Sequence, residues 1–268
     1  MSATVNATAP KIMGILNVTP DSFSDGGQHS GVEAALAFAR KMVADGTDII
    51  DIGGESTRPG SLPVDEKEEF RRVIPVVEAI RTAGISTPLS IDTRHASVAR
   101  AALERGAAII NDVSAFESEP AMADIVRDFG AICILMHGYT PNQGTGIRVV
   151  IDYLRTRIDY ALSRGIPREK IIVDPGFGFN KNTAENCALL THLGELKELG
   201  VPFLAGLSRK RFIGALTGEE IPEKRLAGSL AGALLAAQSG AAILRVHDVQ
   251  ETKKAISLLA ACVNSAMH

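Results

Sequence analysis

The feature that most constrains the fold is a regular alternation of short apolar runs with longer segments of helical character. The runs are continuously hydrophobic rather than alternating between apolar and polar residues. Continuous runs are typical of strands in a parallel sheet that is covered on both faces. Eight such runs are found, at residues 12–16, 49–52, 88–91, 107–110, 131–136, 171–173, 201–205 and 241–246.

Segments with helical hydrophobic spacing separate these runs. The first spans Val32 to Val43, and Ser30 with Glu33 is predicted to form a capping box at its start. The others lie at residues 66–81, 97–105, 120–129, 151–162, 183–199, 221–238 and 256–263. Eight strands alternating with eight helices in about 250 residues predict a single (β/α)8 barrel. The barrel is expected at residues 11–268, after a flexible tail at residues 1–10.

Other classes of protein fit the chain less well. An open doubly wound sheet is the alternative fold, but neither GxGxxG nor GxxxxGK[ST] is present. The net charge of −3 argues against bulk attraction to nucleic acid or to an anionic membrane. Residues 226–244 are uncharged, but their glycines and polar residues favour a buried helix over a membrane span. Three widely spaced cysteines predict no disulfide framework and favour a cytoplasmic location.

Polar residues end nearly every apolar run. Active sites of (β/α)8 barrels lie at the carboxyl ends of the strands, so these residues are expected to converge on one rim. The rim combines carboxylates and an asparagine with arginine, lysine and histidine. That mixture suits a substrate with an amide- or amidine-rich ring and a phosphate or diphosphate group. The residues are Asn17, Glu55, Asp92, Asn111, His137, Asp174, Ser208, Arg209, Lys210, Arg245 and His247.

Three glycine-containing loops follow these strands. The loops at residues 18–27 and 53–60 are long, and we expect them to be mobile and to close over a substrate. The third, DPGFGF at residues 174–179, would let the backbone approach a flat ligand on which Phe179 stacks. His137 is equally consistent with a structural histidine and with a ligand-binding one.

At these motifs the chain resembles the dihydropteroate synthases. The matching segments, in family order, are residues 13–27, 51–60, 91–93, 110–112, 135–137, 174–179, 208–210 and 245–249. The resemblance implies a TIM barrel and a transferase of folate biosynthesis that is a sulfonamide target. Its substrates would be 6-hydroxymethyl-7,8-dihydropterin diphosphate and 4-aminobenzoate, and its products 7,8-dihydropteroate and diphosphate. It also implies Mg²⁺ as cofactor and a homodimer.

The resemblance further implies roles for single residues. Asp92, Asn111, Asp174 and Lys210 match the pterin-binding positions, and Arg245 stacks on the pterin or helps to hold diphosphate. Substrate contacts are also expected from Thr57, Arg58, Phe179 and His247, while Phe23, Pro59 and Lys210 match the aminobenzoate pocket. Asn17 matches the Mg²⁺ position, with Asp25 as a second ligand on the first loop. Lys210, Asp92, Asp174 and Arg58 are the expected catalytic residues.

The chain departs from the family pattern at two places. Arg211 stands where relatives commonly carry a serine that receives the aminobenzoate carboxylate, and a bulkier side chain there could alter sulfonamide binding. Residues 138–146 also differ. Two other functions are the alternatives: a folate-dependent corrinoid methyltransferase and a non-catalytic pterin-binding partner. Release of diphosphate in the presence of both substrates would distinguish these from a synthase.

Overall fold

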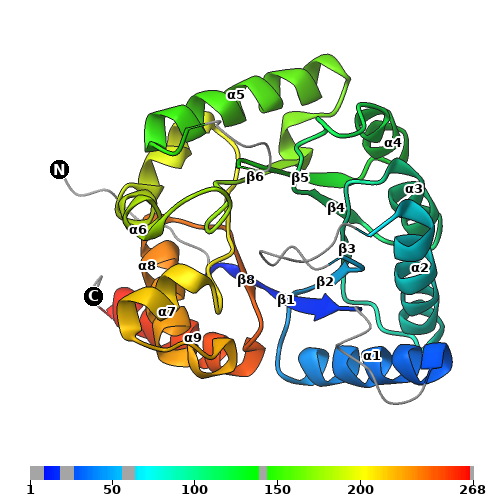
Figure 1. Ribbon diagram of the computed structural model, residues 1–268, viewed down its shortest axis with the longest axis horizontal. Helices are drawn as coiled ribbons and strands as arrows, with labels where there is room; N and C mark the ends of the chain where they lie inside the picture. The colour runs from blue at the N-terminus through cyan, green and yellow to red at the C-terminus, as the bar shows by residue number, and fades with distance from the viewer. Residues whose placement is uncertain (1–8, 19–26, 56–63, 139–143, 266–268) are drawn as a thin grey trace.

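The computed structural model describes residues 9–18, 27–55, 64–138 and 144–265. Eight parallel strands form a ring, and the helices that follow them lie around its outside, as Figure 1 shows. The predicted (β/α)8 barrel is therefore confirmed. The strands are β1 (Lys11–Asn17), β2 (Ile49–Gly53), β3 (Leu89–Asp92), β4 (Ile109–Asp112), β5 (Ile132–Met136), β6 (Ile171–Asp174), β7 (Leu204–Ala205) and β8 (Ile243–Val246).

Neighbouring strands pair in chain order, and β1 pairs with both β2 and β8. The ring closes between β6 and β7 through a single bridge from Val173 to Phe203, next to a 3.0 Å hydrogen bond from the Val173 N–H to the Pro202 carbonyl. The apolar run at 201–205 is thus strand only at its end. Pro202 has no N–H to donate to a ladder, which accounts for the short β7.

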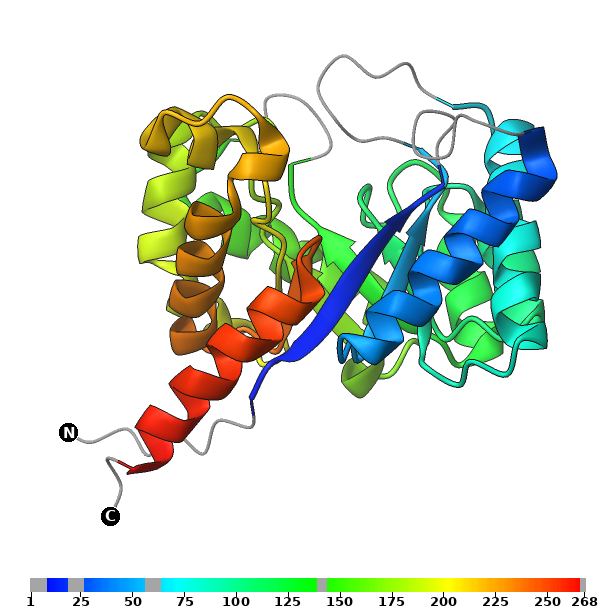
Figure 2. The same cartoon turned by 90° about the horizontal axis from the view of Figure 1, so that it is seen from below.

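The helices are α1 (Gly27–Ala44), α2 (Glu66–Thr82), α3 (Ala96–Glu104), α4 (Ala121–Phe129), α5 (Ile147–Ser163), α6 (Thr183–Thr191), α7 (Arg211–Thr217), α8 (Leu226–Ser239) and α9 (Val249–Ser265). Short 3₁₀ helices occur at η2 (Arg168–Lys170), η3 (Leu193–Leu199) and η4 (Pro222–Lys224). In Figure 2, α9 lies alongside β1 and packs next to α8. Within the described residues, none of these helices is both long and apolar enough to span a bilayer.

Several helix boundaries differ from the prediction. Helix α1 begins at Gly27, so Ser30 lies inside the helix and the predicted capping box with Glu33 is wrong. A capping box is instead present at α6, where Asn182 accepts from the Glu185 N–H at 3.0 Å. The segment at 183–199 is divided at His192 into α6 and η3, and α7 is additional to the eight-helix repeat.

Apolar side chains fill the barrel in two layers. One cluster lies between the strands and the surrounding helices, and a second lies inside the ring. The inner cluster consists of Met13, Ile49, Ile109, Ile134, Ile172, Leu204 and Ile243. These side chains fill the interior of the ring below the carboxyl ends of its strands, the ends at which active sites of such barrels lie.

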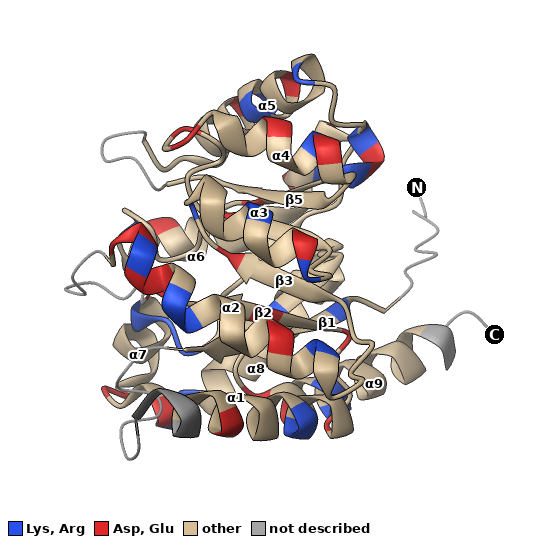
Figure 3. Ribbon diagram, turned by 90° about the vertical axis from the view of Figure 1, so that its right-hand side faces the viewer, with Lys and Arg blue, Asp and Glu red and all other residues tan. Residues whose placement is uncertain are grey.

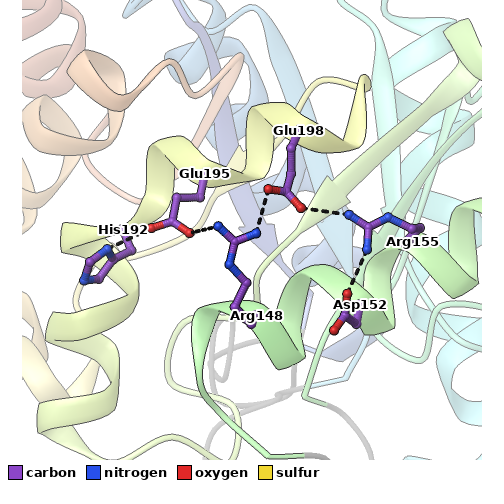
Figure 4. Close-up of polar contacts among 6 residues, drawn as sticks. All are labelled: Arg148, Asp152, Arg155, His192, Glu195 and Glu198. Atoms are coloured by element: carbon purple, nitrogen blue, oxygen red, sulfur yellow. Dashed lines mark hydrogen bonds and ion pairs between the residues drawn. The ribbon is translucent and has the colours of Figure 1, made fainter.

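Charged residues occupy the outer helices. On the side seen in Figure 3, acidic and basic residues are interspersed along the helices. Figure 4 shows one network that joins α5 to η3: Arg148 donates to Glu195 and Glu198, at 2.8 and 2.7 Å, and Arg155 donates to Glu198 at 2.8 Å. Solvent-exposed pairs of this kind contribute little to stability. The network links α5 to η3 on the outside of the barrel.

Candidate active site at the carboxyl end of the barrel

A polar layer lies directly above the inner apolar cluster. Successive side chains of a strand point to opposite faces of the sheet. The residue two positions after an inward-facing residue therefore also faces inward. Ile49, Ile109, Ile172 and Ile243 of the inner cluster are followed in this way by Asp51, Asn111, Asp174 and Arg245. Four strands thus supply polar side chains to one layer, and Asp92 from β3 completes this polar floor.

A cavity of about 1020 Å³ opens above this floor. Its lining includes Asn17, Asp92, Phe179, Lys210, Arg211, Arg245 and His247 among the residues predicted for the site. Asn111 and Asp174 are buried beside it, at 4% and 7% exposure. The structure therefore brings together every predicted site residue that it describes.

Arg245 is the centre of the charge arrangement. Its Nε donates to Asp51 Oδ2 at 2.6 Å, and its Nη2 donates to Asp92 Oδ2 at 2.7 Å. Burial alone would lower the pKa of Arg245, but the two carboxylates raise it above its ordinary value. Burial raises the pKa of Asp92 to about 7, although the Arg245 charge opposes that shift. With a pKa of about 7, the Asp92 carboxyl group can both take up and release a proton near neutral pH.

Lys210 lies opposite, against the DPGFGF loop. Its ammonium group donates to the Phe177 carbonyl and lies 4.6 Å from the centre of the Phe179 ring. Burial lowers the pKa of Lys210 to about 8, with the Asp174 carboxylate opposing the shift. Burial raises the pKa of Asp174, and the charge of Lys210 is the largest opposing influence. A carboxylate and an ammonium group thus face one cavity with both charges weakly solvated.

The glycines of this loop are required by its backbone. Gly176 has a φ of +70°, and a Cβ there would lie 1.8 Å from the His137 carbonyl oxygen. Gly178 has a φ of +77°, and a Cβ there would lie 2.9 Å from Lys210 Cδ. Only glycine combines this conformation with so close an approach. In the structure these glycines make room for Lys210 and for His137, which follows β5. The approach of a flat ligand to this loop stays a prediction.

Lys181 holds the same loop through its carbonyl groups and also contacts His137. Lys181 Nζ lies 3.1 Å from His137 Nδ1 and donates to the carbonyls of Gly176 and Phe179, at 3.0 and 3.2 Å. Burial, reinforced by the Lys181 charge, lowers the pKa of His137 to about 3, so the imidazole is neutral and accepts from Lys181. His137 is fully buried, which favours the structural interpretation that the sequence left open.

The rim beside β1 and β8 is suited to an anion. The Ser208 hydroxyl accepts from the backbone N–H of His247 at 3.2 Å. The same hydroxyl oxygen lies 3.0 Å from Nδ1 of the His247 imidazole. Because the hydroxyl has one proton to give to Nδ1, we infer that Nε2 carries the imidazole proton and acts as a donor. Arg209 pairs with Asp248, its Nε 3.1 Å from Oδ2. Arg211 is exposed at the start of α7.

Five predicted residues lie outside the described part of the chain: Phe23, Asp25, Thr57, Arg58 and Pro59. The two loops that carry them, at 18–27 and 53–60, are described only at their ends. Their expected mobility and substrate contacts remain predictions.

Sequence reasoning missed Asp51 and Lys181. Asp51 stands inside an apolar run rather than at its end, and a charged residue two positions beyond Ile49 was the available signal. Lys181 carries no such signal, because its partner His137 is 44 residues away in the sequence.

Comparison with known proteins agrees with this geometry. The family model described as pterin binding enzyme matches residues 13–247. Dihydropteroate synthase of Haemophilus influenzae is 43% identical over 97% of both chains, and that of Bacillus subtilis is 42% identical over 94% of this chain and 88% of its own. Among solved structures, Xanthomonas albilineans dihydropteroate synthase with 4-aminobenzoic acid has 52% identity and a TM-score of 0.90, covering 94% of this chain and 93% of that one. The same organism's enzyme in complex with 7,8-dihydropteroate has 49% identity and a TM-score of 0.88, covering 97% and 95%.

Proposed function

The chain belongs to the dihydropteroate synthases of the pterin binding enzyme family, and we propose how its residues divide the reaction between them. The enzyme condenses 6-hydroxymethyl-7,8-dihydropterin diphosphate with 4-aminobenzoate, giving 7,8-dihydropteroate and diphosphate. The observation that supports the division best is the polar floor of the cavity, which offers carboxylate, amide, ammonium and guanidinium groups together. Because the similar proteins are named as dihydropteroate synthases, corrinoid methyl transfer and a non-catalytic role are not favoured.

The pterin ring lies on the polar floor in this proposal. The N–H groups of the pterin donate to the carboxylates of Asp174 and Asp92 and to the side-chain amide oxygen of Asn111. Its ring carbonyl accepts from Lys210. Arg245 is held flat between two carboxylates and is available to stack on the ring. Phe179 lies beside Lys210 at the edge of the same pocket.

Diphosphate leaves toward the rim formed by β1 and β8. The His247 imidazole and the guanidinium of Arg245 face that rim, and Arg58 of the second loop is proposed to join them. Hydrogen bonds to a charged oxyanion are the strong ones, and they strengthen as negative charge develops on the leaving group.

We propose that Mg²⁺ binds with the diphosphate, with Asn17 supplying a side-chain oxygen. Asn17 ends β1 and lines the cavity. The described residues contain no group of three or more His, Cys, Asp or Glu side chains placed to hold a metal. Mg²⁺ commonly takes only one or two protein ligands and fills its octahedron with waters and phosphate oxygens, so a lone Asn17 fits this cation. Asp25 stays the proposed second ligand. Mg²⁺ would supply charge neutralisation to the leaving diphosphate.

The bond changes are simple. The C–O bond between the pterin methylene and diphosphate breaks, a C–N bond to the arylamine forms, and the amine loses one proton. We propose that the leaving group departs before attack, because an electron-rich dihydropterin can carry the positive charge. Asp174 and Asp92 would offset this charge from within a poorly solvated pocket. The arylamine is nucleophilic without prior deprotonation, so positioning supplies most of what it needs.

The acceptor site is proposed to lie between Lys210 and Arg211, under the two substrate loops. Phe23, Pro59 and Thr57 of those loops would cover the 4-aminobenzoate ring, and sulfonamides would compete for the same place. Arg211 is exposed, lines the cavity and is the first residue of α7, directly after Lys210. We propose that its guanidinium pairs with the aminobenzoate carboxylate.

Replacing Arg211 with serine should raise KM for 4-aminobenzoate about fivefold while leaving kcat and pterin affinity unchanged. A partly exposed charge pair is worth about 1 kcal/mol, and binding lost equally from ground state and transition state appears in KM alone. The matched control is 4-aminobenzamide, which lacks the negative charge. Its KM should be the same for wild type and Arg211→Ser. An unchanged KM for 4-aminobenzoate would assign its carboxylate to the backbone instead.

The overall function is tested by measuring diphosphate release with each component omitted in turn. Release should require the dihydropterin diphosphate, 4-aminobenzoate and Mg²⁺ together, and 7,8-dihydropteroate should form in equal amount. Release without 4-aminobenzoate would contradict a synthase. Pterin binding without any release would indicate a binding protein.

We also propose that the enzyme is a cytoplasmic homodimer. Three consecutive helices carry well-exposed leucines: Leu216 of α7, Leu235 of α8 and Leu258 of α9 are 59%, 50% and 68% exposed. The helices α7, α8 and α9 are neighbours in this order, and we infer that their outer side pairs with a second copy. The free thiols of Cys133 and Cys187 fit a reducing compartment.

A further inference from the structure

Asp51 lies beneath the cavity without lining it. It is the third residue of β2, its side chain has no exposure, and its strand neighbours in register are Ile15 and Ser90. Asp92 and Arg245 line the cavity, and Asn111 and Asp174 beside it keep 4% and 7% exposure, whereas Asp51 has none. A carboxylate this deeply buried is costly unless it is paired, so its partners indicate its role.

Those partners are two of the residues assigned to the pterin. Asp51 Oδ2 accepts from Arg245 Nε at 2.6 Å, and the same oxygen lies 3.4 Å from Asn111 Nδ2. One carboxylate oxygen on β2 is therefore the meeting point of side chains from β4 and β8.

The contact with Arg245 determines the orientation of its guanidinium. The group is planar, and its donors form a rigid fork. With Nε fixed by Asp51 and Nη2 fixed by Asp92, two points of the plane are anchored on adjacent strands. With the Asp92 contact alone, the group could turn about that single bond. Asp92 faces the cavity and is needed by substrate, so Asp51 is the anchor that ligand binding leaves in place.

We propose that Asp51 is a positioning residue, which orients Arg245 and, through the weaker contact, Asn111 for the pterin ring. This inference rests on the pterin pocket of the proposed function. Asp51 touches neither substrate and acts through the two side chains that do. It therefore affects pterin binding and leaves the 4-aminobenzoate site unchanged.

The experiment measures affinity for 6-hydroxymethyl-7,8-dihydropterin, which lacks the leaving group, by calorimetry on purified full-length protein. Asp51→Ala should weaken this affinity about tenfold, as is typical when a partner that orients a binding side chain is removed. Asp51→Asn keeps an oxygen acceptor for Arg245 and should lose only about threefold. KM for 4-aminobenzoate should stay within about twofold of wild type in both variants.

A matched control separates positioning from structural support. Asp112 is equally buried, but it accepts from the Ser114 hydroxyl at 2.7 Å and the Phe116 N–H at 2.9 Å, in the turn after β4. Asp112→Asn should lower Tm without changing pterin affinity. If Asp51 were a structural carboxylate of the same kind, its variants would lower Tm and leave pterin affinity intact, which would overturn the proposal.

A double-mutant cycle tests whether Asp51 acts through Arg245. In an Arg245→Met background, the loss caused by Asp51→Ala should shrink to about threefold or less, because the side chain it positions is gone. An undiminished tenfold loss would overturn the proposal, as would an equal rise in KM for 4-aminobenzoate. If Asp51→Ala does not fold, the isosteric Asp51→Asn carries the same cycle. Wild-type protein that fails to bind the pterin would contradict the proposed pocket itself, which distinguishes the two failures.

Discussion

Replacing Lys210 with alanine is expected to lower kcat/KM by about 100-fold while the barrel stays folded. Lys210 is the ammonium group proposed to donate to the pterin carbonyl, and burial keeps it poorly hydrated. A charge-assisted hydrogen bond of this kind, with its partner left unpaired, is worth about 2.7 kcal/mol, which corresponds to that factor. Steady-state kinetics with both substrates varied would measure the loss.

Stability should change little in this variant. Lys210 occupies the N-cap position of α7, but its side chain makes no capping hydrogen bond there. The bond to the Phe177 carbonyl is the main loss. For a chain of this length about 1 kcal/mol shifts Tm by roughly 2–4 °C. Arg155→Ala is the matched control: it also removes a cation, but from the network on α5, and should leave kcat/KM unchanged.

The pH profile offers a second test of Lys210. Its pKa of about 8 lies below the ordinary value for lysine, so the ammonium group is lost as pH rises through about 8. Wild-type kcat/KM should therefore fall on the alkaline side, and Lys210→Ala should lack this decline. Lys181 has a pKa lowered by burial to about the same value. A decline that persists in Lys210→Ala would assign it to Lys181 and contradict the role given to Lys210.

The strand pattern was predictable because hydrophobic periodicity is local. A run of about four to six hydrophobic residues is enough to predict a strand. The polar residues that end it, such as Asp92 and Asp174, follow directly in the sequence. The same reasoning failed where tertiary contacts decide. Ser30 with Glu33 has the form of a capping box, but α1 begins upstream at Gly27. Pro202 shortened β7 although the run around it is apolar.

The residues at the rim of the candidate site could be predicted from the sequence, but the residues that hold them in place could not. Side chains at strand ends converge because a parallel barrel places all those ends on one face. Asp51 lies one step deeper, and its importance depends on Arg245, which is 194 residues away. Lys181 likewise depends on how the loop after β6 folds back onto His137. Contacts of such range follow from the closed ring of strands, which no local pattern encodes.

Asp174→Asn should lower kcat by about 100-fold with a smaller change in KM for the dihydropterin diphosphate. The amide keeps the shape of the carboxylate and can still accept from the Gly176 N–H, which donates to Asp174 Oδ1 at 2.8 Å. What disappears is the negative charge proposed to offset the cation that forms as diphosphate leaves. Preorganised charge acts mainly in the transition state, so its loss appears in kcat.

The same substitution has a second consequence that can be measured independently. The Asp174 charge raises the pKa of Lys210 against the effect of burial. Without that charge the pKa of Lys210 falls below about 8, and the alkaline decline of kcat/KM should move to lower pH. A variant in which only KM rises, with the pH profile unchanged, would show that Asp174 binds the ring through shape and hydrogen bonding alone. A lower kcat together with a displaced decline would show that one carboxylate both stabilises the developing cation and keeps its neighbouring lysine protonated.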